Sequence, residues 1–174
     1  LPLFVNHGEG GITQDWNYTY TVKAYSGNHL SSRNMNGIDF DYIPAPTLTK
    51  ASAVLEGVQI EWKCDNTNVI KYNVYRKNGA SWLYLGNTTE KTFIDTNAVP
   101  GVNNTYTVKA YSDINAGAYN NTGITVKYLA APKLEPLTFD SNYRSIVKWE
   151  KSAGATGYKI YRKINDASSW YLVT

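Results

Sequence analysis

Histidine, cysteine and methionine are almost missing from this chain of 174 residues, which has two histidines, one cysteine and one methionine. The lone Cys64 cannot close an internal disulfide, and we expect a small, partly buried side chain rather than a nucleophile. His7 and His29 have no Cys, Asp or Glu at the spacing of metal ligands. Asp39 and Asp41 flank Phe40, and we expect them on a solvated strand face, with a calcium-binding pair as the alternative. The sequence therefore predicts no metal site.

Charge and long apolar runs are also scarce. Charged residues make up 18% of the chain, and its net charge of +3 is dispersed without a run of like charges. A nucleic-acid partner is therefore not expected, because such partners need a concentrated basic patch. No apolar run approaches the roughly 18 residues of a membrane-spanning helix, so we expect no membrane insertion. The chain begins at Leu1 without a signal peptide, and we interpret it as a processed or trimmed piece.

Groups of residues typical of enzymes are missing as well. Glu61, Asp65 and Glu150 show no spacing that would pair two carboxylates for acid–base chemistry. The glycine-rich residues 8–11 lack the Lys-Ser/Thr continuation of a phosphate-binding loop, and we interpret them as an inserted loop. The sequence therefore predicts no catalytic residue, no cofactor and no enzymatic activity.

Aromatic and turn-forming residues are abundant by contrast. The chain has 15 tyrosines and 5 tryptophans, and 13 glycines are scattered along it. Tyr, Thr, Val and Ile favour the pleated surfaces of strands over helices. With 43% hydrophobic residues a packed core is expected. This composition predicts many short strands.

An internal repeat organises the sequence. Residues 19–26 (TYTVKAYS) return after 86 positions as residues 105–112 with the same letters. Residues 72–77 (YNVYRK) return at the same offset as residues 158–163 (YKIYRK). Other positions repeat at the same offset or with a shift of one or two residues: Gly37/Gly123, Tyr42/Tyr128, Pro46/Pro132, Trp62/Trp149 and Trp82/Trp170. A period this long indicates a complete small domain rather than a solenoid turn.

Alternating apolar residues mark the strands of the middle copy. Val58, Ile60 and Trp62 alternate with polar residues, as on a half-buried strand. The Asn78-Gly79 pair is a strong hairpin signal. We expect strands at 58–62, 72–76, 82–85, 92–94, 106–110 and 124–128. About seven strands in a repeat of this length are typical of an all-β, immunoglobulin-like sandwich.

The strand-B Trp (Trp62, Trp149), the YxV/IYRK block and the TYTVKAY block resemble the fibronectin type III family, most closely its tandem versions in surface and secreted bacterial proteins. The resemblance covers the whole chain and implies a seven-stranded sandwich in tandem units. It further implies that Tyr106 and Tyr20 hydrogen-bond to upstream backbone at a strand corner. Trp62 and Trp149 are expected in the cores. All four roles are structural.

The repeat divides the chain into three parts. Residues 44–130 are expected to form one complete repeat, residues 1–43 the C-terminal half of another, and residues 131–174 the N-terminal half of a further one. Pro44, Pro46 and Pro132 mark the joints. A half sandwich exposes an inner face and unpaired strand edges. We therefore expect the two halves to complement each other between chains, in a homodimer or a head-to-tail filament; a neighbouring repeat of the same parent chain is the alternative partner.

Aromatic residues of uncertain facing supply the candidate binding site. These are Tyr75, Trp82, Tyr84, Trp170 and Tyr171. Flat aromatic surfaces bind sugar rings and proteins, although packing against a neighbouring sheet explains such residues too. The sequence predicts a non-catalytic spacer or adhesion module, extracellular or on a bacterial cell surface. A module that binds polysaccharide or a host glycoprotein is the alternative.

Overall fold

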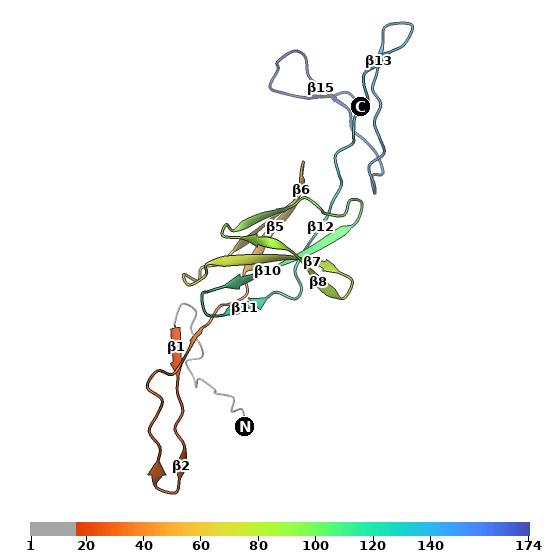
Figure 1. The fold of residues 1–174 in the computed structure, drawn as a ribbon. Coiled ribbons are helices and arrows are strands. Elements are labelled where there is room, and N and C mark those ends of the chain that lie inside the picture. Colours follow the sequence, from red (N-terminus) through yellow and green to blue (C-terminus); the bar gives the residue numbers. More distant parts are fainter. Residues whose placement is uncertain (1–16) are drawn as a thin grey trace.

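The central part of the chain folds into two antiparallel sheets in a computed structural model that describes residues 17–174 (Figure 1). The first sheet has the order β5-β6-β9, with β5 at Thr47–Val54, β6 at Gly57–Lys63 and β9 at Thr92–Asp95. In the second sheet β8 pairs with β7, β7 with β10, and β10 with both β11 and β12. Their bounds are β7 Lys71–Asn78, β8 Ser81–Thr88, β10 Asn103–Tyr111, β11 Ala116–Tyr119 and β12 Ile124–Lys127.

This strand order is that of an immunoglobulin-like sandwich of the fibronectin type III kind. Strands β11 and β12 both pair along the same edge of β10 and are separated by residues 120–123, so together they act as one interrupted edge strand. The two sheets then hold seven strands, and residues 17–174 contain no helix of any kind, including none that could cross a membrane. The predicted fold class is confirmed.

The predicted strands are found, with differences at their ends. The hairpin at Asn78-Gly79 is confirmed, because β7 ends at Asn78, Gly79 has φ +60° and β8 starts at Ser81. Strand β8 is longer than the expected 82–85. Strand β5 was not predicted, because its sequence, TLTKASAV, has little apolar alternation and its register shifts between Leu48 and Lys50.

The core lies between the two sheets of the central sandwich. Buried side chains come from β6 (Val58, Ile60, Trp62), from β7 (Tyr72, Val74) and from β10 (Tyr106, Val108, Ala110). Trp62 is 3% exposed, as predicted, and its ring packs edge-on against Tyr72 at 5.4 Å. Cys64 is buried at the margin of this core. The core cluster begins at Ile43 and, with the residues packed against it, ends at Ala130.

An N-terminal ribbon and a C-terminal segment lie at opposite ends of the central sandwich (Figure 1). The N-terminal ribbon, residues 17–43, pairs β1 (Asn17–Tyr20) with β4 (Ile38–Asp41) and β2 (Tyr25–Ser26) with β3 (His29–Leu30). The C-terminal segment, residues 131–174, pairs β13 (Thr138–Phe139) with β14 (Ser145–Ile146) and β15 (Tyr161–Arg162) with β16 (Tyr171–Leu172). Residues 1–16, with His7 and the 8–11 loop, lie outside the described residues.

Trp149 differs from its expected burial, and Tyr20 is found on the N-terminal ribbon. Trp149 was predicted to be a core residue but is only half-buried, because among the described residues no second sheet covers its face. Its contact with Tyr158, at 5.2 Å, nevertheless matches the Trp62–Tyr72 contact of the central sandwich. Tyr20 is half-buried on the N-terminal ribbon and stacks on Tyr18 at 6.3 Å.

Strand pairings also recur after 86 positions. Asn17–Tyr20 face Ile38–Asp41 in the register in which residues 103–106 face 124–127. Thr21 and Thr107 each donate a 2.7 Å hydrogen bond to a backbone carbonyl, of Asn34 and Asn120 respectively. At the other end, the isolated bridge Leu134–Trp149 matches the Leu48–Trp62 pair.

Candidate functional site

Tyr106 belongs to a buried charged cluster that joins the two sheets. Its hydroxyl donates to Asp95 Oδ2 over 3.0 Å, and Arg76 Nη1 donates to the same oxygen and, over 2.7 Å, to the carbonyl of Asn97. The expected backbone acceptor is therefore wrong: the acceptor is the carboxylate that ends β9. Burial, helped by this carboxylate, raises the pKa of Tyr106 well above its ordinary value. The cluster is structural, because a phenol held protonated between sheets cannot reach a ligand.

Five aromatic side chains gather on the outer surface of the second sheet, away from the core. We call this set the outer aromatic face; its members are Tyr75, Trp82, Tyr84, Tyr111 and Tyr119. Tyr75 meets Tyr84 at 5.7 Å and Tyr119 at 6.0 Å between ring centroids. Trp82 meets Tyr119 edge-on at 6.2 Å. Tyr119 thus links the aromatic residues of β7 and β8 across the sheet.

Lysine ammonium groups lie close to these rings. Lys77 Nζ lies 5.8 Å from the Trp82 ring, and Lys109 Nζ lies 5.6 Å from Tyr111 and 5.9 Å from Tyr119. The Tyr75 hydroxyl, together with burial, raises the pKa of Tyr111 to about 12. A sheet face with aromatic rings, ammonium groups and phenol donors can bind polar, flat or anionic molecules.

The structure brings together only part of the predicted ligand-binding set. Tyr75, Trp82 and Tyr84 share the outer aromatic face, whereas Trp170 and Tyr171 lie in the C-terminal segment. Sequence reasoning missed Tyr111 and Tyr119. Alternation with the buried Ala110 could have placed Tyr111 outward, but β11, Ala-Gly-Ala-Tyr, has no apolar pattern that orients Tyr119.

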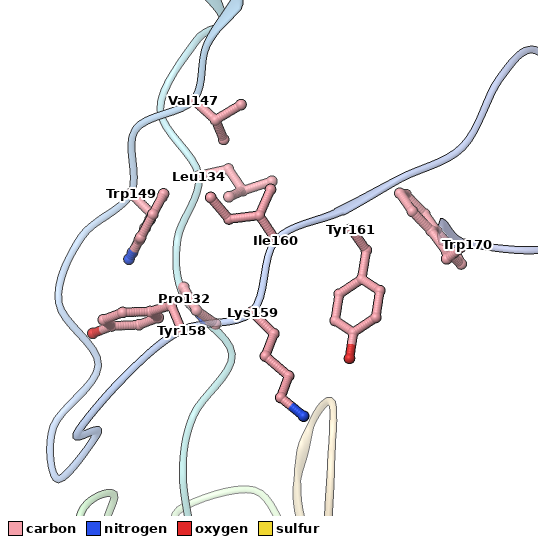
Figure 2. Close-up of a pocket in the computed structure, with 9 residues that line it drawn as sticks. All are labelled: Pro132, Leu134, Val147, Trp149, Tyr158, Lys159, Ile160, Tyr161 and Trp170. Atoms are coloured by element: carbon pink, nitrogen blue, oxygen red, sulfur yellow. The ribbon is translucent and has the colours of Figure 1, made fainter. Parts of the chain in front are cut away.

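A second surface is an apolar groove of about 560 Å³ in the C-terminal segment (Figure 2). Leu134, Val147 and Ile160 point toward one another across it, and Trp149 borders them. The remaining lining residues are Pro132, Tyr158, Lys159, Tyr161 and Trp170. We call this the apolar groove. Trp170 is 62% exposed, and Lys163 Nζ lies 5.4 Å from its ring.

Amide side chains hold the joint between the N-terminal ribbon and the central sandwich. Asn115 accepts from the Asp41 backbone N–H over 3.0 Å and donates to the Asp41 carbonyl over 2.8 Å. Asn66 donates to the Tyr42 carbonyl over 2.9 Å, and Asn68 donates to the side chain of Asn17 over 2.8 Å. Asp41 is only 5% exposed, so the expected solvated strand face is wrong at this residue. Asp39 is exposed and accepts from Thr19 over 2.7 Å.

Close backbone packing defines the joint with the C-terminal segment. A Cβ on Gly154 would lie 2.6 Å from Gly101 Cα, so the loops carrying these glycines touch directly. Ser152 is buried beside this contact and stands 86 positions after Asn66, which is buried at the other joint. Both joints therefore use the loop after the second strand of the following unit.

The described residues offer no metal centre: among residues 17–174 no three or more His, Cys, Asp or Glu side chains are grouped to hold an ion. No family model matches the chain. No curated protein matches it either.

Several solved structures are similar in part. The twitchin kinase region from C. elegans aligns with 60% of this chain and 20% of its own length, at 13% identity and a TM-score of 0.45. A β-1,2-glucanase from Parabacteroides distasonis aligns with 57% of this chain and 17% of its own length, at 18% identity and a TM-score of 0.44. The FN1–FN3 domains of chicken CNTN1 align with 94% of this chain and 65% of their own length, at 16% identity and a TM-score of 0.41.

The chain thus spans less than two thirds of each of these proteins. At such low scores the fold assignment depends on the strand order and pairing of residues 44–130.

Proposed function

We propose that this chain is a non-catalytic spacer of a tandem β-sandwich array, holding neighbouring parts of a parent protein at a fixed distance and orientation. The observation that carries the proposal is the pair of built joints. Flexible linkers between domains have few contacts, whereas here Asn66, Asn68 and Asn115 hydrogen-bond across one joint. At the other joint Gly101 and Gly154 are in close contact.

The recurrence of strand pairing after 86 positions supports the tandem arrangement, because the N-terminal ribbon and the C-terminal segment repeat parts of the central sandwich. The chain's resemblance to tandem fibronectin type III repeats favours a bacterial cell-surface or secreted parent protein. In such a protein the spacer would present an adhesive or catalytic domain. Neighbouring repeated units are then the natural partners, either from the same parent or from a second copy of this chain.

Distance measurement across the first joint tests the spacer. Spin labels at His29→Cys and Asn78→Cys, both exposed positions, report the ribbon against the central sandwich, while Cys64 is buried and stays unlabelled. Labelled chains are diluted with unlabelled ones so that only distances within a chain are read. A rigid joint should give one narrow distance distribution.

Gly117→Ala should broaden that distribution, because a Cβ there would lie 2.6 Å from the Ile43 carbonyl oxygen and 2.7 Å from its Cγ2. Gly157→Ala is the matched control, since nothing lies within 4 Å of its Cβ. A broad distribution in the unmodified chain would refute the spacer.

A second candidate function is polysaccharide binding by the outer aromatic face, and Tyr119 favours it by joining Trp82 and Tyr75 into one surface. The nearby Lys77 and Lys109 favour an acidic polysaccharide or the acidic glycans of a host glycoprotein. Trp82→Ala and Tyr119→Ala should each weaken binding to an immobilised acidic polysaccharide about tenfold, or ~1.4 kcal/mol. Trp170→Ala, outside this face, is the control. Equal binding by all variants would eliminate this function.

A further inference from the structure

We propose that the apolar groove of one copy of this chain binds the N-terminal ribbon of a second copy, so that chains join head to tail. The inference rests on the repeated unit that underlies the proposed function. It names an occupant for the groove, which no other described residue covers: Leu134 is 69% exposed at its centre.

The apolar groove is lined by the counterparts of central core residues. Leu134 stands 86 positions after Leu48, and Ile160 stands 86 positions after Val74, which is fully buried. In the central sandwich Val74 lies opposite Val108 of β10 in the same sheet, so β10 is the strand that pairs beside this position and adds its own buried side chains to the core. The groove is therefore lined by residues that correspond to a sandwich interior, without the neighbouring strand that β10 supplies in the central sandwich.

The N-terminal ribbon carries that missing strand. Residues 19–26 have the same letters as residues 105–112 of β10, and the ribbon already pairs β1 with β4 as β10 pairs with β12. Val22, the counterpart of Val108, is 85% exposed, whereas Val108 is 1% exposed. The same apolar side chain is thus buried where its partner surface is present and open to solvent where it is not.

Transferring the β7–β10 register by 86 positions defines the new contact. Val22 of one copy would lie opposite Ile160 of the other, as Val108 lies opposite Val74. One pair is unfavourable, because Lys23 would face Lys159 where Lys109 faces Asn73 in the central sandwich. This like-charge pair supplies a specific test of the register.

The two surfaces cannot meet within one chain, because the ribbon and the C-terminal segment lie at opposite ends of the central sandwich (Figure 1). A contact between two different patches of the same molecule is heterologous, and it grows into open chains when its geometry does not close a ring. The tight joints keep the two ends apart, so open head-to-tail assembly is the expected form.

Sedimentation velocity of the 174-residue chain at rising concentration tests the proposal, with growth beyond the monomer as the expected result. Val22→Asp on the ribbon and Ile160→Asp in the groove should each weaken self-association at least about a hundredfold, because each would bury an unpaired charge. Leu55→Asp is the matched control; this leucine is 78% exposed in the β5–β6 turn, away from both surfaces.

Mixing the two defective variants gives the sharpest result. The Val22→Asp chain keeps its groove and the Ile160→Asp chain keeps its ribbon, so the mixture should form a heterodimer and stop there. Far-ultraviolet circular dichroism checks that each variant is folded. A mixture that stays monomeric, or a parent chain that is monomeric at every concentration, would overturn the proposal.

Two further variants distinguish the second copy from other occupants. Lys159→Asn restores the central Lys–Asn pairing and should tighten self-association roughly two- to fivefold; no change would refute the register. A chain in which a second copy of residues 1–43 follows Thr174 should fill its own groove and remain monomeric, and continued assembly would refute the groove as the binding surface. Failure of self-association would leave the label distances within one chain unaffected, so it is distinguishable from failure of the spacer.

Discussion

Removing the single hydroxyl oxygen of Tyr106 isolates the contribution of the buried charged cluster. In Tyr106→Phe the ring still fills its place in the core, where Tyr106 has no exposed surface, so no cavity forms. What is lost is the 3.0 Å hydrogen bond to Asp95, a carboxylate that is only 3% exposed. Asp95 keeps Arg76 and the Asn97 backbone N–H as donors, so it is not left without a partner.

The expected destabilisation follows from the charge of the acceptor. A hydrogen bond to a charged group contributes about 1.5–3 kcal/mol, against about 0.5–1.5 kcal/mol for a neutral one. Because two donors remain on Asp95, we expect the lower part of the first range, about 1.5–2 kcal/mol. In a domain of this size that corresponds to a fall in Tm of roughly 6–16 °C.

Urea unfolding followed by far-ultraviolet circular dichroism measures this change as a lower midpoint at constant m-value. Tyr119→Phe is the matched control, since it removes a hydroxyl from a half-buried surface tyrosine and should change the free energy of unfolding by less than about 0.5 kcal/mol. If Tyr106→Phe were as stable as this control, the cluster would not stabilise the fold and the reasoning would be wrong.

Two further predictions concern pH and backbone conformation. Burial raises the pKa of both Tyr72 and Tyr106, so the unfolded chain loses these phenol protons near pH 10 while the folded chain keeps them. The stability that the two buried phenols contribute is therefore complete below pH 10 and is lost as pH rises above it. The urea concentration at the midpoint of unfolding should decrease as the pH is raised from 8 to 11. An unchanged midpoint would show that burial of these phenols does not contribute to stability. Gly123→Ala should cost about 2 kcal/mol or more of unfolding free energy, because φ is +70° and the new Cβ would lie 2.5 Å from the Tyr106 carbonyl oxygen. Gly79→Ala, at φ +60° with open space around it, should cost only about 1–2 kcal/mol, and equal losses for the two variants would show that the close contact at Gly123 relaxes.

Local pattern accounts for most of what could be predicted about the central sandwich. Val58, Ile60 and Trp62 alternate with polar neighbours, and strands that bury one face show that alternation in any sandwich. Strand β5 was not predicted because its Ala, Ser and Thr residues do not alternate clearly between apolar and polar side chains. The acceptor of the Tyr106 hydroxyl was also wrong, since nothing near Asp95 in sequence indicates that its carboxylate turns inward.

The sequence by itself determined the repeating unit, its seven-stranded class and the identity of its core tryptophan, Trp62, because these depend on periodicity and side-chain type. Only the tertiary structure decided which residues from distant parts of the chain meet. Tyr119 contacts Tyr75 and Trp82, and Asn115 hydrogen-bonds to the backbone of Asp41. The tertiary structure also separated the exposed Val22 from the buried Val108, although both stand in the same string of letters. The physical reason is that burial depends on the surface a strand packs against, and that surface comes from other parts of the fold.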